Sequence, residues 1–191
     1  MIPLIETVTG KLVDVVNPDP DTLDIDDIAW SLSRISRFAG HTITAQPYTV
    51  AQHCIFVSDL IYENTSNITL ALFGLLHDAA EAYIGDIPSP IKHIPELKRI
   101  IKPIEDNLLD KICRKYVYKV PTKDDYVIIK MHDKTSQFIE ANAFMPSRGK
   151  NWPGWSENKI SLLEHQKFSP PEPSIIVYQK FLNRFNELRN M

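Results

Sequence analysis

Residues 68–83 form the most apolar segment of the chain, and they constrain its fold more than any other stretch. The segment reads ITLALFGLLHDAAEAY, and within its apolar run His77, Asp78 and Glu81 stand together as polar residues. A helix that is apolar on nearly every side belongs in a protein core, with other helices packed around it. Because a helix turns by about 100° per residue, the three polar side chains are expected within one arc of about 100°.

Placing these three polar side chains in a core carries an energetic cost. Burying two carboxylates and an imidazole is unfavourable unless something compensates for the lost water, and two neighbouring carboxylates also repel each other. A bound divalent cation would relieve both effects. The alternative is a polar edge that faces solvent on an otherwise buried helix. Apolar residues flank the three polar side chains, and this favours a buried cation site over a solvent-facing edge.

Apolar periodicity and capping signals predict further helices. Apolar residues at helical spacing predict a helix over 24–39 that Gly40 ends. Thr49 and Gln52 form a capping box that opens another helix. The remaining helices are expected at 68–83, 95–117, 122–143 and 174–189, with Pro103 kinking or splitting the second of these and Thr122 with Asp125 opening the third.

Little regular structure is expected outside these helices. Residues 144–173 contain several proline and glycine breakers and are predicted to be mostly irregular. Near the N-terminus, TVTGKLVDV is compatible with a short β-hairpin that turns at Thr9-Gly10. The predicted fold class is therefore all-α, a bundle of about six or seven helices in a single domain that spans residues 1–191.

Composition and missing motifs exclude several classes of protein. The six glycines never cluster, so neither a Walker loop nor a Rossmann fingerprint is present. The chain also lacks the motifs of serine hydrolases and zinc proteases. A net charge of −3 argues against polymeric nucleic acid as a partner. No apolar run reaches the roughly 20 residues that span a bilayer. Cys54 and Cys113 lie at apolar helical positions, which fits buried thiols in a cytoplasmic protein.

His53 and Asp133 extend the candidate metal site beyond the central helix. Either residue alone is more often structural or exposed than a ligand. Together with His77 and Asp78 they offer two imidazoles and two carboxylates from three predicted helices, and helical bundles build metal sites from such inward-facing side chains. This donor set suits Zn²⁺, Mn²⁺, Co²⁺ or Fe²⁺, and Mg²⁺ could join with a phosphate-bearing substrate.

Basic residues near these positions are candidates for phosphate binding. Arg34 and Arg37 are expected on one face of the predicted helix 24–39, and His41 follows just beyond its end. Lys92 follows a loop directly after the central helix. Arginine suits bidentate contact with phosphate, and lysine acts as a point charge. The alternative is that these are solvated surface cations.

The order of His53, His77-Asp78 and Asp133 resembles the HD-domain metal-dependent phosphohydrolases. The match extends to a phage and prophage branch of that family through four segments: DIAWSLSRISRFAGH (27–41), YTVAQH (48–53), LLHDAAEAYIGDIPSPIK (75–92) and FLNRFNEL (181–188). That branch is similar to bacterial deoxyribonucleoside 5′-monophosphatases and includes phage dATP triphosphohydrolases. The resemblance covers roughly residues 6–145 and the last helix, and it implies an HD-type helical bundle.

The resemblance also implies which residues hold the metal and act in catalysis. Glu81 would orient or deprotonate the attacking water. Asp86 would assist as an acid/base or as an outer ligand of a second ion. The main divalent ion, with Zn²⁺, Co²⁺ or Mn²⁺ expected and Mg²⁺ as a possible addition, would be held by His53, His77, Asp78 and Asp133.

The substrate side of the site follows from the same resemblance. Arg37 would contact phosphate or sugar, and Lys92 would contact the phosphate chain. Phe38 and His41 would line the nucleoside pocket. The sequence departs from the family in one respect: Asp133 and Glu140 fit its pattern, but no arginine follows Glu140.

These features predict a metal-dependent phosphohydrolase that acts on small deoxynucleotides. The first choice is a dATP triphosphohydrolase that releases deoxyadenosine and triphosphate. Three alternatives stay open: a deoxyribonucleoside 5′-monophosphatase, a non-catalytic nucleotide-binding HD module, and a phosphodiesterase, which the net charge disfavours. No membrane association is expected, the predicted location is the cytoplasm (of the host, if a phage encodes the chain), and the resemblance implies a homo-oligomer.

Overall fold

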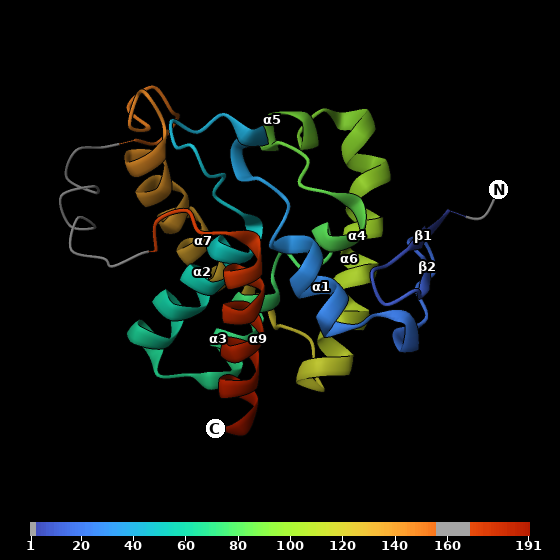
Figure 1. The fold of residues 1–191 in the computed structure, drawn as a ribbon. Coiled ribbons are helices and arrows are strands. Elements are labelled where there is room, and N and C mark those ends of the chain that lie inside the picture. Colours follow the sequence, from blue (N-terminus) through green and yellow to red (C-terminus); the bar gives the residue numbers. More distant parts are fainter. Residues whose placement is uncertain (1–2, 156–168) are drawn as a thin grey trace.

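The computed structural model of the chain describes residues 3–155 and 169–191, and helices make up most of it (Figure 1). Helix α3 (Ile68–Leu76) lies at the centre, with every residue from Leu70 to Leu76 buried. It packs against α2, α6, α7 and α9. The all-α prediction and the central position of this segment are therefore confirmed. The surrounding helices are α1 (Ile25–Leu32), α2 (Val50–Thr65), α4 (Glu81–Ile84), α5 (Ser89–Lys92), α6 (Pro95–Val117), α7 (Lys123–Phe144) and α9 (Ser174–Asn190).

Three long helices, α6, α7 and α9, begin and end within one residue of their predicted bounds. Helix α2 has the predicted capping box between Thr49 and Gln52, and α7 has the one between Thr122 and Asp125. The sequence predicts that Pro103 kinks or splits its helix; α6 runs without a break through Pro103, so the split does not occur. Pro103 lies on the exposed side of α6, where water can satisfy the backbone carbonyl that loses its N–H partner.

The predicted helix over 24–39 ends early, at Leu32. Ser36 forms a β-bridge with Thr49, and the Arg37 amide donates to the Tyr48 carbonyl at 2.9 Å. These bonds draw the chain away from α1 and into a short 3₁₀ turn (Arg37–Gly40). The prediction that Arg34 and Arg37 share one helix face is therefore wrong, since Arg34 lies over the ring of Trp30 and Arg37 belongs to the turn.

The predicted helix over 68–83 is interrupted between Leu76 and Glu81. Nδ1 of His77 lies 2.7 Å from the Gly74 carbonyl oxygen, and the next backbone bonds join residues three apart, as from Ala79 to Leu76. His77 and Asp78 therefore lie in a turn between α3 and α4, and not on one regular helix with Glu81. Gly85, with φ +79°, ends α4 where the sequence predicts.

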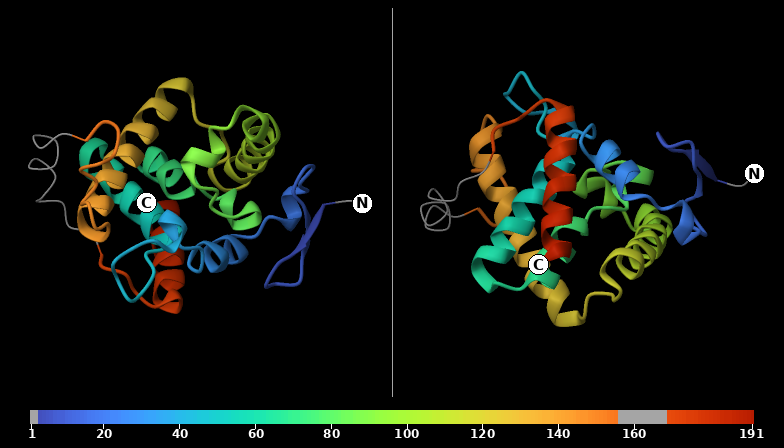
Figure 2. Two further views of the ribbon diagram at one scale, coloured as in Figure 1. Left: turned by 90° about the horizontal axis from the view of Figure 1, so that it is seen from above. Right: turned by 60° about the horizontal axis from the view of Figure 1, so that its bottom comes forward.

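The N-terminal hairpin lies at the edge of the molecule (Figures 1 and 2). Strands β1 (Leu4–Glu6) and β2 (Leu12–Asp14) pair antiparallel, with Ile5 opposite Val13. Gly10 takes φ +80° in the connecting turn, as the predicted hairpin requires. Thr9 joins the hairpin to α1, because its amide and hydroxyl both donate to the carboxylate of Asp27.

The C-terminal helix α9 completes the bundle against α1, α2 and α3. Its buried face carries Val177, Phe181, Phe185 and Leu188. Cys54 and Cys113 are both buried free thiols, as predicted. Residues 145–155 form turns, and residues 156–168 of the predicted irregular stretch lie outside the described residues. Among the described helices, none has the length and apolar character that crossing a membrane requires.

Candidate metal centre and its surroundings

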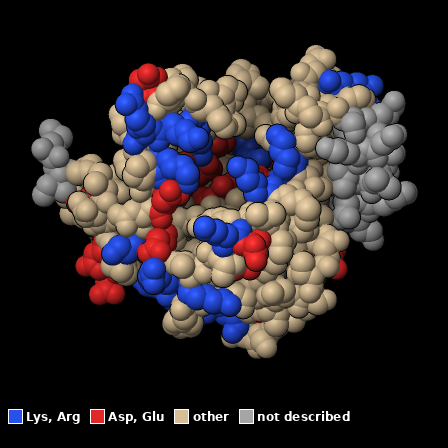
Figure 3. Space-filling view, turned by 180° about the vertical axis from the view of Figure 1, so that it is seen from behind, with Lys and Arg blue, Asp and Glu red and all other residues tan. Residues whose placement is uncertain are grey.

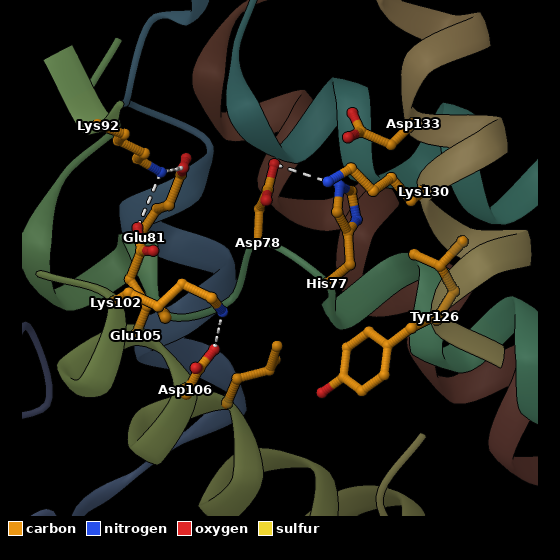
Figure 4. A pocket seen from close by; sticks show the side chains of 13 residues that line it. His77, Asp78, Glu81, Lys92, Lys102, Glu105, Asp106, Tyr126, Lys130 and Asp133 are labelled. Carbon is orange, nitrogen blue, oxygen red and sulfur yellow. Dashed lines mark hydrogen bonds and ion pairs between the residues drawn. The ribbon is translucent and has the colours of Figure 1, made fainter. Parts of the chain in front are cut away.

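The side chains of His53, His77, Asp78 and Asp133 meet at one place between α2, α7 and the turn after α3. Nε2 of His53 lies 3.3 Å from Nε2 of His77, 3.2 Å from Oδ1 of Asp133 and 3.7 Å from Oδ2 of Asp78. Nε2 of His77 lies 3.3 Å from the same Asp78 oxygen. Figure 4 shows His77, Asp78 and Asp133 directed toward this point.

The second ring nitrogens show how the two imidazoles are oriented. Nδ1 of His77 faces the Gly74 carbonyl at 2.7 Å, and a carbonyl can only accept a hydrogen bond. Nδ1 of His53 faces Oε1 of Glu140 at 2.7 Å. Both Nδ1 atoms therefore carry a hydrogen, which leaves the two Nε2 atoms, 3.3 Å apart, as the positions that would bind a cation. Metal-ligating histidines are usually held in this way, and a divalent cation fits this donor set.

The surroundings also keep the carboxylates ionised. Burial by itself would raise the pKa of Asp78, but His77, His53 and Arg37 hold it well below its usual range. The pKa of Asp133 is lowered against the effect of burial by its hydrogen bond with His53 and by the charge of that residue. Ionised carboxylates are the form that ligates a metal.

Cys54 offers a second grouping, with His77 and Asp78. Burial raises the pKa of the Cys54 thiol to about 11. A thiol with this pKa stays protonated at neutral pH, and the thiolate is the form that binds metals. The set with two histidines and two aspartates is therefore the better metal site.

Glu81 lies beside the cluster and is held by a lysine. Its Oε1 accepts from Nζ of Lys92 at 2.8 Å, and Lys92 also pairs with Glu105 at 2.9 Å (Figure 4). Its Oε2 is buried and has no hydrogen-bond partner among the described residues. Burial and the charges of Asp78 and Asp86 raise the pKa of Glu81 to about 8, despite Lys92.

The predicted substrate residues lie at different distances from this centre. Nη1 of Arg37 is 3.8 Å from Oδ2 of Asp78, so the guanidinium borders the cluster. Asp86 follows α4 and is partly buried. Phe38 packs against Trp152, with ring centroids 5.7 Å apart, and His41 is exposed. Neither Phe38 nor His41 lines the pocket that opens on the cluster.

That pocket has a volume of about 440 Å³. Its floor includes His77, Asp78, Glu81 and Asp133, and its walls carry Lys92, Lys102, Tyr126 and Lys130. From behind, the surface shows a hollow with acidic side chains inside and basic side chains around it, in keeping with these charges (Figure 3).

Several residues around the centre were not among the predicted site residues. Lys130 stands three residues before Asp133, and Glu140 stands seven residues after it. Helical spacing therefore places both on the same face of α7 as Asp133. That spacing is the signal that could have identified them. Lys102, Glu105 and Tyr126 come from parts of α6 and α7 that carry no local motif, and only the packing of those helices brings them to the pocket.

Comparisons with known proteins agree with this geometry. A family model described as 5′-deoxynucleotidase YfbR-like matches residues 30–145. The uncharacterized protein YfdR of Escherichia coli K12 is 32% identical over 188 residues, which cover 98% of this chain and 96% of that protein. A 5′-deoxynucleotidase of Photobacterium profundum is 31% identical over 90 residues, which cover 40% of this chain and 46% of that protein.

The matched segment contains the whole candidate metal centre, together with Arg37, Glu81 and Asp86. The family model covers more than half of the chain, and YfdR aligns over nearly its full length. The names of these relatives favour the monophosphatase alternative over the dATP triphosphohydrolase. This chain belongs to the YfbR-like 5′-deoxynucleotidase family, and it is a metal-dependent phosphohydrolase of the HD type.

Proposed function

We propose that the chain hydrolyses deoxyribonucleoside 5′-monophosphates to deoxynucleosides and orthophosphate. The observation that carries the proposal is the convergence of His53, His77, Asp78 and Asp133 in a chain of the YfbR-like family. The base that the enzyme prefers is a further proposal: adenine, on the resemblance to phage dATP triphosphohydrolases. Homo-oligomerisation also stays a prediction, which light scattering on the purified chain would measure.

The four clustered side chains would hold one divalent cation. When bound, such a cation polarises a phosphoryl oxygen and makes water more acidic. Zn²⁺, Co²⁺ and Mn²⁺ suit two imidazoles and two carboxylates, and Mg²⁺ favours a site richer in oxygen. Metal content of the purified chain would distinguish these ions.

Glu81 is proposed as the general base. Lys92 fixes its Oε1, which leaves the buried Oε2 to accept a proton from the attacking water. A pKa of about 8 lies close to neutral pH, where proton transfer to a carboxylate is most effective. The pairing of Lys92 with Glu81 and Glu105 gives this lysine a role in holding the base, besides its predicted contact with phosphate.

Arg37 and Asp86 are proposed to act on the substrate. The Arg37 guanidinium is almost buried and borders Asp78, where it would neutralise charge on the phosphate. Burial raises the pKa of Asp86, which suits this carboxyl to protonate the departing nucleoside oxygen. Phe38 and His41 stay the proposed contacts for the nucleoside.

A product assay tests the proposal. The chain would be incubated with Co²⁺, Mn²⁺, Mg²⁺ or EDTA and a panel of ribo- and deoxynucleoside mono- and triphosphates, and the products separated by chromatography. We expect deoxynucleoside and orthophosphate from deoxynucleoside monophosphates, and none of either with EDTA. Deoxyadenosine and intact triphosphate from dATP would replace the proposal with a triphosphohydrolase. Absence of any product with every metal would indicate a nucleotide-binding module.

A further inference from the structure

Glu140 is a fully buried carboxylate that binds His53 and Arg37, from different parts of the chain, and also the hydroxyl of Tyr48. Its side chain is 0% exposed, on α7 two turns after Asp133. Oε1 accepts from Nδ1 of His53, in α2, at 2.7 Å. Oε2 accepts from Nε of Arg37, in the 3₁₀ turn, at 3.0 Å. Each oxygen of one carboxylate therefore binds a different member of the candidate site.

The two bonds have separate consequences for the site. The bond to His53 keeps a hydrogen on Nδ1 and leaves Nε2, which faces His77 and Asp133, as the atom that would bind the metal. The bond to Arg37 holds its Nε edge inside the protein and leaves Nη1 beside Asp78. His77, in contrast, is oriented by the backbone carbonyl of Gly74, which holds no other group of the site.

We propose that Glu140 is a positioning residue that aligns the metal-binding imidazole of His53 and the phosphate-binding guanidinium of Arg37 together. The inference rests on the proposed function, because it assigns Arg37 to the phosphate. A carboxylate has two equivalent acceptor oxygens, whereas a carboxamide has one acceptor and one donor. Glu140→Gln keeps the size of the side chain but can no longer accept from both Nδ1 of His53 and Nε of Arg37.

The first measurement is calorimetric titration of the metal-free chain with Co²⁺, which needs no substrate. The second is steady-state hydrolysis of deoxyadenosine monophosphate at saturating Co²⁺. For Glu140→Gln we expect one of two results. Loss of the bond to His53 would weaken the Co²⁺ affinity by about 10- to 100-fold. Loss of the bond to Arg37 would raise KM by about 10-fold, with kcat less affected. For Glu140→Ala, which removes both bonds, we expect both changes. Circular dichroism would show that each variant keeps the native helix content.

Two further variants separate positioning from general stability. Ser136→Ala removes the other contact of His53 Nδ1, which lies 3.2 Å away, and leaves Arg37 untouched, so KM should not change. In a double-mutant cycle with Arg37→Ala, the KM effects of Glu140→Ala should be much less than additive. Additive KM effects would overturn the link through Arg37. A Co²⁺ affinity and a KM within twofold of the native values in Glu140→Ala would overturn the whole proposal.

The outcomes also distinguish this inference from the proposed function. If the unsubstituted chain hydrolyses no monophosphate, the proposed function fails in that assay. The Co²⁺ titration then still tests the alignment of His53, since it reports binding alone. Loss of helix content in both Glu140 variants would assign the residue to folding and would overturn its positioning role.

Discussion

At the scale of single residues, the centre keeps buried charge because almost every charged atom has a partner. Asp78 faces His77 and Arg37, and Glu81 faces Lys92. Removing one member of a buried pair is strongly destabilising because the other charge is left uncompensated, whereas the pair itself adds little net stability. The cluster is therefore better explained as a binding site than as a source of folding stability.

Asp78→Ala should strongly weaken metal binding, remove turnover and keep the helices. Asp78 supplies a carboxylate that faces both histidines, so its loss should weaken Co²⁺ affinity by at least about 100-fold. Calorimetric titration and circular dichroism of the metal-free variant measure the two effects. Glu63→Gln changes an exposed carboxylate on α2 and serves as the matched control. Native Co²⁺ affinity in Asp78→Ala would remove this residue from the ligand set.

Glu81→Gln should keep the metal and lose turnover. The carboxamide can still accept from Lys92, but it cannot take a proton, and general-base catalysis contributes about 10²- to 10⁴-fold. Glu105→Gln is the matched control, because it changes the other carboxylate that binds Lys92 and should lower kcat far less. Retention of more than half of the native kcat by Glu81→Gln would refute its role as the base.

At the scale of secondary-structure elements, the sequence predicts what local interactions determine. The capping boxes at Thr49 and Thr122 act within four residues, and both are present in the structure. The end of α1 was missed because it depends on bonds from Arg37 and Ser36 to the chain before α2. The break after α3 was missed because the His77 side chain binds the Gly74 carbonyl, which periodicity does not reveal.

Gly85 offers a prediction at this scale, because it ends α4 between Glu81 and Asp86. Its φ of +79° and ψ of 162° lie in a region that is open almost only to glycine. A Cβ there would meet no atom within 4 Å, so Gly85→Ala tests backbone strain alone. We expect a loss of about 1–3 kcal/mol in the free energy of unfolding, measured by urea denaturation, and a fall in kcat.

Gly10→Ala is the matched control for that variant. Gly10 also has a positive φ, +80°, and open space around its Cα, but it lies in the hairpin. It should lose stability through the same kind of strain and keep the native kcat in the folded fraction. An equal fall in kcat for both variants would indicate general destabilisation in place of a local effect on Glu81 and Asp86.

At the scale of the whole molecule, the bundle brings together residues that are far apart in the sequence. His53 and Asp133 are separated by 80 positions, yet their side chains lie 3.2 Å apart. Spacing along the chain predicts no such distance, and only the chemistry of the four side chains and the family resemblance mark them as candidate ligands. Lys102 reaches the pocket from α6, and the bonds of Glu140 to His53 and Arg37 join three separate segments, so only the structure shows these contacts.

Metal binding should therefore stabilise the whole fold. A cation held by α2, α7 and the turn after α3 would tie three separate segments, and the unfolded chain offers no such site. At a Co²⁺ concentration of about 100 times Kd, linkage adds about 2.7 kcal/mol, which raises Tm by about 5–10 °C in a chain of this length. Scanning calorimetry with EDTA and then with Co²⁺ measures the shift. Asp78→Ala should show no rise, and an equal rise in that variant would place the stabilising ion elsewhere.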